Sequence, residues 1–357
     1  MATTILYGFH ELADIFADRV VNVEAEVIST AIQRSVDEHN RQLNAVMVLF
    51  AAPTTAYSAR FAQGGNHRLQ PLDENGRARP IIPLGHYDTA YPIRDAGTAW
   101  GANYKTLAKM TVEEANRITA EMLKADASWM RDQLMAALFQ SATYTYVDPQ
   151  YGSLTVQPLA LTSDGVTYPR NGAVAASTDD HHLATADAVA TVTDPVPGIV
   201  SELDEHPENQ GDVIVLIPTN LKADFMALGD FHAITDPNLT LGANTDTVNG
   251  TGPGVAVPGE VIGYHEAGAW LVEWKQLPSN YAIATTANAE PALRMREEPE
   301  AELQGFHLAG ERNDHPFYEA QWLRSAGFGA YSRIGALVYR FGNGTYAAPT
   351  GYDAPIG

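Results

Sequence analysis

Four consecutive residues, Asp179, Asp180, His181 and His182, are the strongest candidates for chemistry in this sequence. Carboxylates and imidazoles are common ligands of zinc and other transition metals. Adjacent residues on a strand point to opposite faces, and on a helix they diverge by about 100°, so four in a row cannot converge well on one ion. The pattern therefore favours a solvated loop or a helix N-terminus, and we expect no metal site.

The remaining chemical motifs are weak. His10 and Glu11 lack the second histidine of a zinc-protease helix. The glycine-rich stretch 250–254 has no lysine, and the sequence contains no G-x-S-x-G elbow, Walker loop or G-x-G-x-x-G motif. Cysteine is absent, which excludes disulfides, thiolate metal sites and a cysteine nucleophile. We expect no catalytic residue and no cofactor. The enzyme hypothesis that stays open is a metal-dependent hydrolase that uses His181 or His182 with acidic partners.

Charge is unevenly distributed along the chain. The net charge is −21, of which residues 1–110 contribute −1 and residues 111–357 contribute −20. Within residues 57–94, five arginines stand against three acidic residues. This mildly basic segment is suited to lie on the acidic body of a neighbouring copy, where charge complementarity would bias orientation. The body lacks the Lys/Arg clusters that neutralise phosphates, so we expect no sequence-specific binding of nucleic acid.

The sequence shows no targeting segment. Glu11, Asp14 and Asp18 lie where a signal peptide needs apolar and small residues. The longest apolar run, Ala45 to Ala52, has eight residues, whereas a membrane span needs about 20. We expect a soluble protein that is intracellular when made and has no membrane partner.

A long helix from Thr111 to Gln140 is the strongest structural prediction. Thr111 and Glu114 match a capping box, and neither Gly nor Pro interrupts the segment. Apolar residues recur at helical spacing along it. The residues expected in the core are Ile118, Met122, Trp129 and Leu134.

An extended ribbon is predicted before this helix, over residues 57–94. Residues 57–62 alternate with period two, and turn signals follow at 63–66 and 73–76. Arg77 to Leu84 would form the returning strand, which its two prolines restrict to a sheet edge. A ribbon with so few large apolar residues is marginal in water, so it needs another surface to lie on.

Further elements are predicted on either side of the ribbon and the long helix. They are a helix over 18–48, a hairpin of 144–147 with 153–156, short helices from 182 and over 197–206, a buried strand over 212–217, a helix over 220–228, a hairpin of 261–264 with 269–274, and a last strand over 330–339.

This order of elements resembles the tailed-bacteriophage major capsid protein family, whose α+β fold is shared with encapsulin shells. The most specific stretches are Asp212-Val-Ile-Val-Leu-Ile-Pro218, followed by a helix, and Gly327-Phe-Gly-Ala-Tyr-Ser-Arg-Ile-Gly-Ala-Leu-Val338. They look like the central axial strand and the closing segment of the family. The resemblance divides the chain into an N-terminal arm and helix (1–56), an E-loop (57–94), a peripheral domain (95–178) with the spine helix 111–140, an axial domain (179–295), and a return to the peripheral domain with a C-terminal tail (296–357).

The resemblance implies a major capsid protein without catalysis, which self-assembles into hexamers and pentamers of an icosahedral shell around double-stranded DNA. The implied partners are further copies of the chain, portal and scaffolding proteins, and a cement protein. The protein would lie in the virion capsid after assembly in the host cytoplasm. The E-loop residues expected to contact neighbouring subunits are Arg60, Phe61, Arg68, Arg77 and Arg79.

Two features bear on how such a shell would be held together. The five lysines all lie outside residues 57–94, so a covalent cross-link through an E-loop lysine is not expected. Because Met1 heads the sequence, a cleaved N-terminal scaffolding segment is not expected either. The alternative within the same fold is an encapsulin-like compartment around a cargo enzyme.

Overall fold

The computed structural model describes most of the chain as a mixed arrangement of helices and strands. The described residues are 7–23, 25–62, 71–78, 86–162, 165–172, 179–209, 211–234, 255–287, 289–314, 317–353 and 355–356. The helices are α1 (Ala25–Met47), α2 (Tyr104–Lys109), α3 (Val112–Phe139), α4 (Val196–Asp204) and α5 (Lys222–Met226).

Sixteen strands lie within these described ranges. They are β1 (Ala51–Thr54), β2 (Ser58–Ala62), β3 (His86–Ala90), β4 (Arg94–Asn103), β5 (Tyr144–Asp148), β6 (Gly152–Val156), β7 (His182–Thr185), β8 (Val213–Ile217), β9 (Phe231–Ala233), β10 (Glu260–His265), β11 (Ala269–Glu273), β12 (Tyr281–Thr286), β13 (Leu293–Arg296), β14 (Phe306–Asp314), β15 (Phe317–Ala330) and β16 (Ala336–Phe341).

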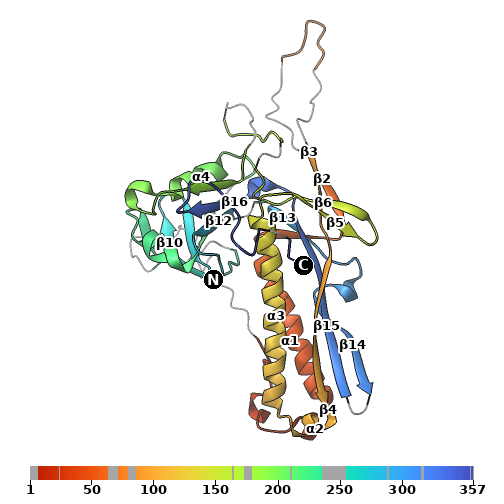
Figure 1. Ribbon diagram of the computed structural model, residues 1–357. Helices are drawn as coiled ribbons and strands as arrows, with labels where there is room; N and C mark the ends of the chain where they lie inside the picture. Colours follow the sequence, from red (N-terminus) through yellow and green to blue (C-terminus); the bar gives the residue numbers. More distant parts are fainter. Residues whose placement is uncertain are drawn as a thin grey trace.

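The long helix α3 forms as the sequence predicts. The Thr111 hydroxyl accepts a hydrogen bond from the Glu114 N–H at 3.2 Å, and the Thr111 N–H donates to Glu114 Oε2 at 3.1 Å. This capping box satisfies two N–H groups that a helix N-terminus leaves unpaired. Gln140 is the C-terminal cap. With 28 residues, α3 is about 42 Å long and runs beside α1 (Figure 1).

The four residues expected in the core of α3 differ in burial. Met122 and Leu134 are buried. Trp129 is only partly buried against the main core, and Ile118 is only partly buried against a smaller cluster around Trp322. Leu134 is therefore the better probe of the contact between α3 and the rest of the core.

Replacing Leu134 with alanine is expected to lower the free energy of unfolding by about 3 kcal/mol, because the cavity lies where α3 meets the main core. Trp129→Ala should cost less than a fully buried tryptophan would, since part of its ring already contacts water. Chemical denaturation of both variants measures the difference. An equal or smaller loss for Leu134→Ala would contradict this packing.

The helix predicted over 18–48 begins later, at Ala25 in α1. The residues before it are held in extended and 3-10 backbone by the segment that leads into α3. The Val20 N–H donates to the Met110 carbonyl at 2.9 Å, and the Val112 N–H donates to the Asp18 carbonyl at 2.9 Å. These long-range backbone bonds outweigh the local helical pattern.

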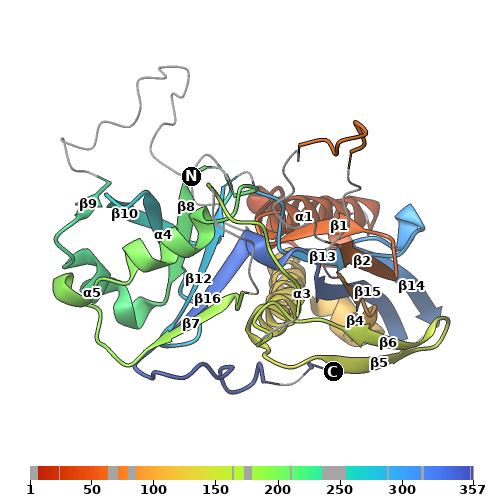
Figure 2. The same ribbon diagram turned by 90° about the horizontal axis from the view of Figure 1, so that it is seen from above.

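A seven-stranded sheet forms the body beside the helical pair, in the order β7-β16-β12-β8-β11-β10-β9. Both of its faces are covered. Ile214 and Leu216 of β8 face the main core with α1 and α3, whereas Val213, Val215 and Ile217 face a second core with α4 and α5. Figure 2 shows α4 and α5 on the side of the sheet away from α1 and α3. A strand buried on both faces explains the continuous apolar run in the sequence.

Two predicted elements in this body need correction. The predicted short helix from His182 is instead the strand β7, which pairs in parallel with β16, so tertiary pairing overrides the local pattern. The last strand, β16, was expected to return to the peripheral domain. It lies between β7 and β12 in the seven-stranded sheet, because Ala336 to Arg340 pair with β12.

A long sheet lies along the helical pair and was not predicted. We call β4, β14 and β15 the arm sheet. Strand β15 is central: it pairs with β14 on one side and with β4 on the other. Phe306 and Trp322 of this sheet pack against Val36 of α1 and Leu123 of α3. Figure 1 shows the arm sheet extending beside α1 and α3, away from the body.

The predicted ribbon is confirmed in part. Strand β2 pairs antiparallel with β3, so the returning strand lies at 86–90. Arg77 and Ala78 are not in a strand, and the rest of the stretch expected to return, 79–84, lies outside the described residues. The second predicted turn forms: the Gly76 N–H donates to the Asp73 carbonyl at 2.9 Å, and Gly76 has φ +71°. All eight residues from 71 to 78 are exposed.

The other predicted hairpins and buried elements form close to their expected positions. Strands β5 and β6 pair as expected, as do β10 and β11. Helix α4 begins one residue before its predicted start and ends within the predicted range, and α5 lies within its predicted range. None of the helices in the described ranges is both long and apolar enough to cross a membrane.

Candidate functional site

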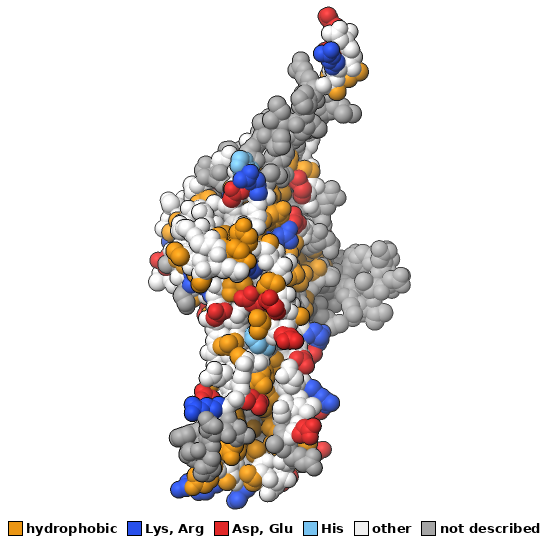
Figure 3. Space-filling view, turned by 90° about the vertical axis from the view of Figure 1, so that its right-hand side faces the viewer, with side chains coloured by type: hydrophobic (Ala, Val, Ile, Leu, Met, Phe, Trp, Pro, Cys, Tyr) orange, Lys and Arg blue, Asp and Glu red, His pale blue; other side chains and the backbone are white. Residues whose placement is uncertain are grey.

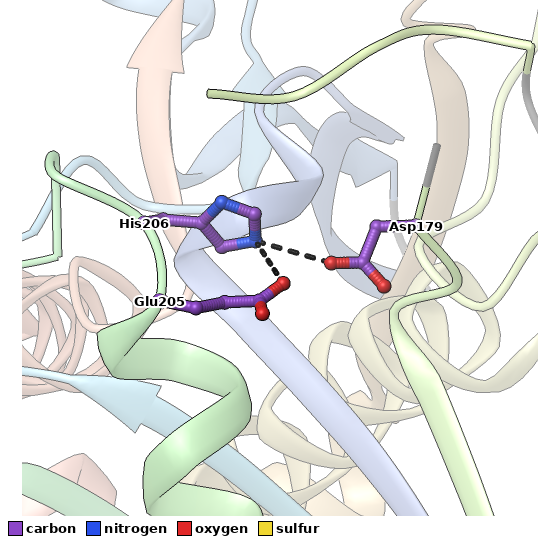
Figure 4. Close-up of side chains that lie close together, drawn as sticks. All are labelled: Asp179, Glu205 and His206. Atoms are coloured by element: carbon purple, nitrogen blue, oxygen red, sulfur yellow. Dashed lines mark ion pairs between the residues drawn. The ribbon is translucent and has the colours of Figure 1, made fainter. Parts of the chain in front are cut away.

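Titratable side chains converge where the chain enters β7 and leaves α4. Asp179 lies three residues before β7, Glu205 caps the C-terminus of α4, and His206 follows it. Their ligand atoms all lie within 4.8 Å of one another. Figure 4 shows the three side chains pointing toward one another. We call these residues, together with the neighbouring Arg170, the acid–histidine cluster.

One hydrogen bond and two nearby carboxylates orient the imidazole of His206. Its Nδ1 donates to the Pro169 carbonyl at 3.0 Å. Its Nε2 lies 3.4 Å from Asp179 Oδ2 and 3.9 Å from Glu205 Oε1. Arg170 Nη2 pairs with Glu205 Oε1 at 2.9 Å and lies 3.8 Å from Asp179 Oδ2. One guanidinium and one imidazole therefore lie between two carboxylates.

The surroundings of the cluster shift the pKa values of its two carboxyl groups in opposite directions. Burial alone would raise the pKa of Asp179, but the adjacent His206 outweighs it and the pKa lies below its usual range. Burial and the nearby Asp179 carboxylate raise the pKa of Glu205 to about 7. Burial would lower the pKa of His206, yet contact with Asp179 and Pro169 raises it. The cluster can thus hold a proton or a cation between its members.

The four consecutive residues of the sequence motif do not converge. The His181 ring packs edge-on against Tyr168, with ring centroids 4.9 Å apart, and burial lowers the pKa of His181 to about 3. His182 contacts Tyr346 instead, at 4.6 Å between centroids. Only Asp179 joins Glu205 and His206. The hydrolase hypothesis required His181 or His182 to meet acidic partners in a hollow, and this arrangement does not support it.

Two hollows in the described part of the molecule lie away from the cluster. One of about 470 Å³ lies between α1, α3 and the arm sheet, lined by Ile28, Met122 and Trp322 among others. Another of about 640 Å³ lies between α1, α3 and the residues around Trp274. Neither is lined by a residue of the acid–histidine cluster, so the cluster is not placed to act on a substrate bound in either hollow.

The ribbon is anchored to the body through aromatic side chains. Phe61 of β2 stacks on Tyr87 of β3 at 5.1 Å between centroids and meets Tyr331 edge-on at 5.6 Å. Tyr168 lies beside Phe61, at 6.3 Å. We call Phe61, Tyr87, Tyr168 and Tyr331 the ribbon root. It fixes the direction in which β2 and β3 leave the body.

The predicted E-loop contact residues occupy different environments. Arg60 forms two hydrogen bonds with Asp88, at 2.6 and 2.9 Å, and so joins β2 to β3. Phe61 is buried in the ribbon root of its own chain, so its aromatic ring offers little surface to a neighbouring subunit. Arg77 is exposed. Arg68 and Arg79 lie outside the described residues.

A buried polar network was missed by the sequence analysis. Asp126 of α3 accepts hydrogen bonds from Arg324 Nε at 2.5 Å and Arg324 Nη2 at 2.7 Å, and its Oδ2 lies 2.8 Å from His39 Nε2. Arg324 also donates to Asn40 Oδ1 at 2.8 Å. The available signal was the position of Asp126, four residues after Met122 on the buried side of α3, where a charge needs a partner.

Comparison with solved structures relates the whole chain to known folds. A chain from a structure of Mycobacterium phage Patience aligns over 100% of both chains, with a TM-score of 0.65 and 20% sequence identity. A chain from the capsid structure of the cyanophage P-SCSP1u aligns over 82% of this chain and 86% of its own, with a TM-score of 0.47 and 11% identity. A virus-like particle from Pyrococcus furiosus gives 89% and 100% coverage, a TM-score of 0.41 and 10% identity. No family model matches the sequence, and no curated protein matches it.

Proposed function

We propose that this protein is a shell subunit. The proposal rests on its fold, which is that of tailed-bacteriophage major capsid proteins, as the sequence predicted. Copies assemble into hexamers and pentamers, and these close into an icosahedral shell around double-stranded DNA. The observation that carries the proposal is the alignment with the phage Patience chain along the full length of both chains. Identical subunits related by closed symmetry form rings, as such a shell requires.

The shape of the subunit supports assembly. The arm sheet is covered on one face by α1 and α3, while Leu308 and Leu323 of β14 and β15 are exposed. Figure 3 shows hydrophobic side chains along the lower half of the molecule, on the side that carries the arm sheet. Leu72 of the ribbon is also exposed. Apolar side chains in such extended positions gain stability when a neighbouring subunit covers them.

The charge distribution supports enclosure of DNA without sequence-specific binding. Residues 111–357 carry a net charge of −20, which repels phosphates. The basic excess of residues 57–94 favours contact with the acidic body of another subunit. The subunit has a structural role and no catalysis, and it resides in the virion capsid after assembly in the host cytoplasm. Its further partners are portal, scaffolding and cement proteins.

The domain boundaries belong to this proposal. Residues 1–56 form the N-terminal arm and helix, 57–94 the E-loop, and 95–178 the peripheral domain with its spine helix. The axial domain covers 179–295 together with β16, since this strand completes the seven-stranded sheet. The rest of 296–357 belongs to the peripheral domain and the tail.

Replacing both Arg77 and Arg79 with glutamate is expected to impair assembly while the monomer stays folded. The side chain of Arg77 is exposed, so its reversal removes attraction to an acidic neighbour without disturbing a core. Size-exclusion chromatography and electron microscopy measure assembly, and circular dichroism measures folding. The matched control is R77K/R79K, which keeps both charges and should assemble normally. Normal shells from the glutamate variant would contradict the role of this charge.

A further inference from the structure

Hydrogen-bond acceptors face one another in the acid–histidine cluster. Asp179 Oδ1 accepts from the Asp180 N–H at 2.9 Å, but Oδ2 accepts no hydrogen bond from the described residues. The Asp179 side chain is 9% exposed, and Oδ2 is directed at His206 Nε2 (Figure 4). Buried carboxylate oxygens are normally satisfied, so an oxygen without a donor indicates a site for a proton, a water molecule or a cation.

The tautomer of His206 adds a third acceptor. Its Nδ1 must carry a proton, because the Pro169 carbonyl can only accept. In the neutral imidazole, Nε2 then presents a lone pair to Asp179 and Glu205. Metal-bound histidines commonly have this arrangement, with the other ring nitrogen donating to a backbone carbonyl.

A second cluster in the chain has the opposite arrangement. Asp194, Asp230 and His265 also place their ligand atoms within 4.8 Å. There His265 Nδ1 accepts from the Ala267 N–H at 3.2 Å, so the proton lies on Nε2, which faces Asp194 Oδ2 at 2.9 Å. A protonated Nε2 offers no lone pair to a cation, although it makes no hydrogen bond with the described residues. The second cluster therefore lacks the imidazole ligand that the first cluster presents.

An independent observation comes from His181. This side chain is 4% exposed, and its Nε2 has no hydrogen-bond partner among the described residues. Its ring lies 6.1 Å from the ring of His206. A buried imidazole with an unpartnered nitrogen therefore lies beside the ring of His206.

The charges leave room for a divalent cation. When ionised, Asp179 and Glu205 each contribute one negative charge, and so does Glu202, which lies close enough to Asp179 to interact with it electrostatically. Arg170 supplies one positive charge to this group. Three carboxylates against one guanidinium give −2, which one divalent cation balances.

We propose that Asp179, Glu205 and His206 bind a zinc-class divalent cation. One imidazole nitrogen and two carboxylate oxygens suit Zn²⁺, whereas Mg²⁺ and Ca²⁺ prefer oxygen ligands alone. With bonds of about 2.1 Å, tetrahedral ligand atoms lie about 3.4 Å apart. In the structure, His206 Nε2 lies 3.4 and 3.9 Å from the two carboxylates, so only small movements are needed.

The cation would stiffen the support of the ribbon. It joins the residues entering β7 to the C-terminus of α4, where the Asn171 N–H already donates to the Glu205 carbonyl at 2.7 Å. Tyr168 contacts both His181 and His206 and also lies beside Phe61 of the ribbon root. The cation would thus lie next to the aromatic side chains that anchor β2 and β3 to the body.

The test uses the tag-free full chain after removal of metals with a chelator. Co²⁺ titration should give the visible absorption of a tetrahedral site with one ion per chain, and Zn²⁺ should displace it. The affinity of the double variant D179N/E205Q for Co²⁺ should fall by more than about 100-fold. Removing a residue that only hydrogen-bonds to a metal ligand costs about 10–100-fold, and this variant changes two of the ligands themselves. The control D194N/D230N should bind as tightly as the original sequence.

Thermal unfolding without metal shows whether each variant is folded. If the double variant is unfolded, E205Q alone is used and should bind at least about 10-fold more weakly. Absence of Co²⁺ binding to the original sequence would overturn the proposal and indicate a shared proton. Binding retained by D179N/E205Q, or lost equally in D194N/D230N, would overturn the assignment to these ligands. The readout is independent of shell assembly.

Discussion

Replacing Asp126 with alanine is expected to lower the free energy of unfolding by about 3–5 kcal/mol. Asp126 joins three elements: it pairs with Arg324 of β15 and contacts His39 of α1, while lying itself on α3. The side chains of Asp126 and Arg324 are 2% and 1% exposed. Alanine would leave the guanidinium buried without its counter-charge. Denaturant unfolding measures the loss.

The matched control for this prediction is Glu121→Ala on the same helix. Glu121 pairs with Lys124 at 2.9 Å, but both side chains are more than half exposed, so the change should be within about 0.5 kcal/mol. A second variant, Asp126→Ala with Arg324→Met, removes both charges and should recover part of the loss. Equal stability of Asp126→Ala and Glu121→Ala would contradict the role of the buried network.

The network also makes the free energy of unfolding depend on pH. Burial alone would raise the pKa of Asp126, but His39 and Arg324 outweigh it and the folded-state pKa is lowered. The contribution of Asp126 is therefore complete above its unfolded pKa of about 4 and is lost as the pH falls through the lower folded pKa. When the pH is lowered from about 5, the free energy of unfolding should therefore fall less for Asp126→Ala than for the original sequence. A parallel decline of both proteins would contradict this linkage.

Replacing Gly327 with valine is expected to abolish the folded state. Gly327 lies in β15, and a Cβ at this position would overlap the carbonyl oxygen and carbon of Pro92, which are backbone atoms and cannot rotate away. Gly329 is similarly close to the Ala90 carbonyl. The segment from β3 to β4 crosses β15 at these two glycines. A side chain would separate this segment from the sheet and displace the ribbon root.

Gly310→Ala is the control, because Gly310 lies in β14 of the same sheet and a Cβ there meets nothing within 4 Å. This variant should unfold within about 0.5 kcal/mol of the original sequence. Circular dichroism and thermal unfolding of the two variants give the comparison. A folded Gly327→Val protein with normal stability would show that the crossing segment lies elsewhere.

The elements predicted correctly from the sequence are those with local determinants. Helix α3 carries its own capping box and an uninterrupted apolar periodicity, so its bounds follow from nearby residues. The buried run at 213–217 is apolar on both sides, as a central strand must be. Hairpins such as β5–β6 are specified by their turns.

The elements that were missed depend on contacts distant in sequence. Strand β15 is stabilised by pairing with β4, which lies more than 200 residues earlier. Gly327 is needed in β15 because the backbone of Pro92 passes close to it. The last strand was predicted over 330–339, whereas β15 continues through Gly327 and Gly329 to Ala330 and the last strand, β16, begins at Ala336. Strand β7 exists because β16 pairs with it.

The candidate site shows the same division. The sequence directed attention to Asp179 and His181, yet the partners of Asp179 come from the end of α4, 26 and 27 residues later. Nothing local links Glu205 and His206 to Asp179. The association requires the fold of the body, because β7 and α4 are brought together only by the seven-stranded sheet and its second core.

Electron microscopy of the purified protein, together with its size-exclusion profile, tests the central proposal most directly. We expect closed shells, or rings of five and six subunits, when the protein is concentrated or co-expressed with the products of its neighbouring genes. Nucleic acid inside the shells would support a virion, and an enclosed enzyme would indicate a compartment for cargo. A folded protein that stays monomeric under all these conditions would contradict the proposal that it is a shell subunit.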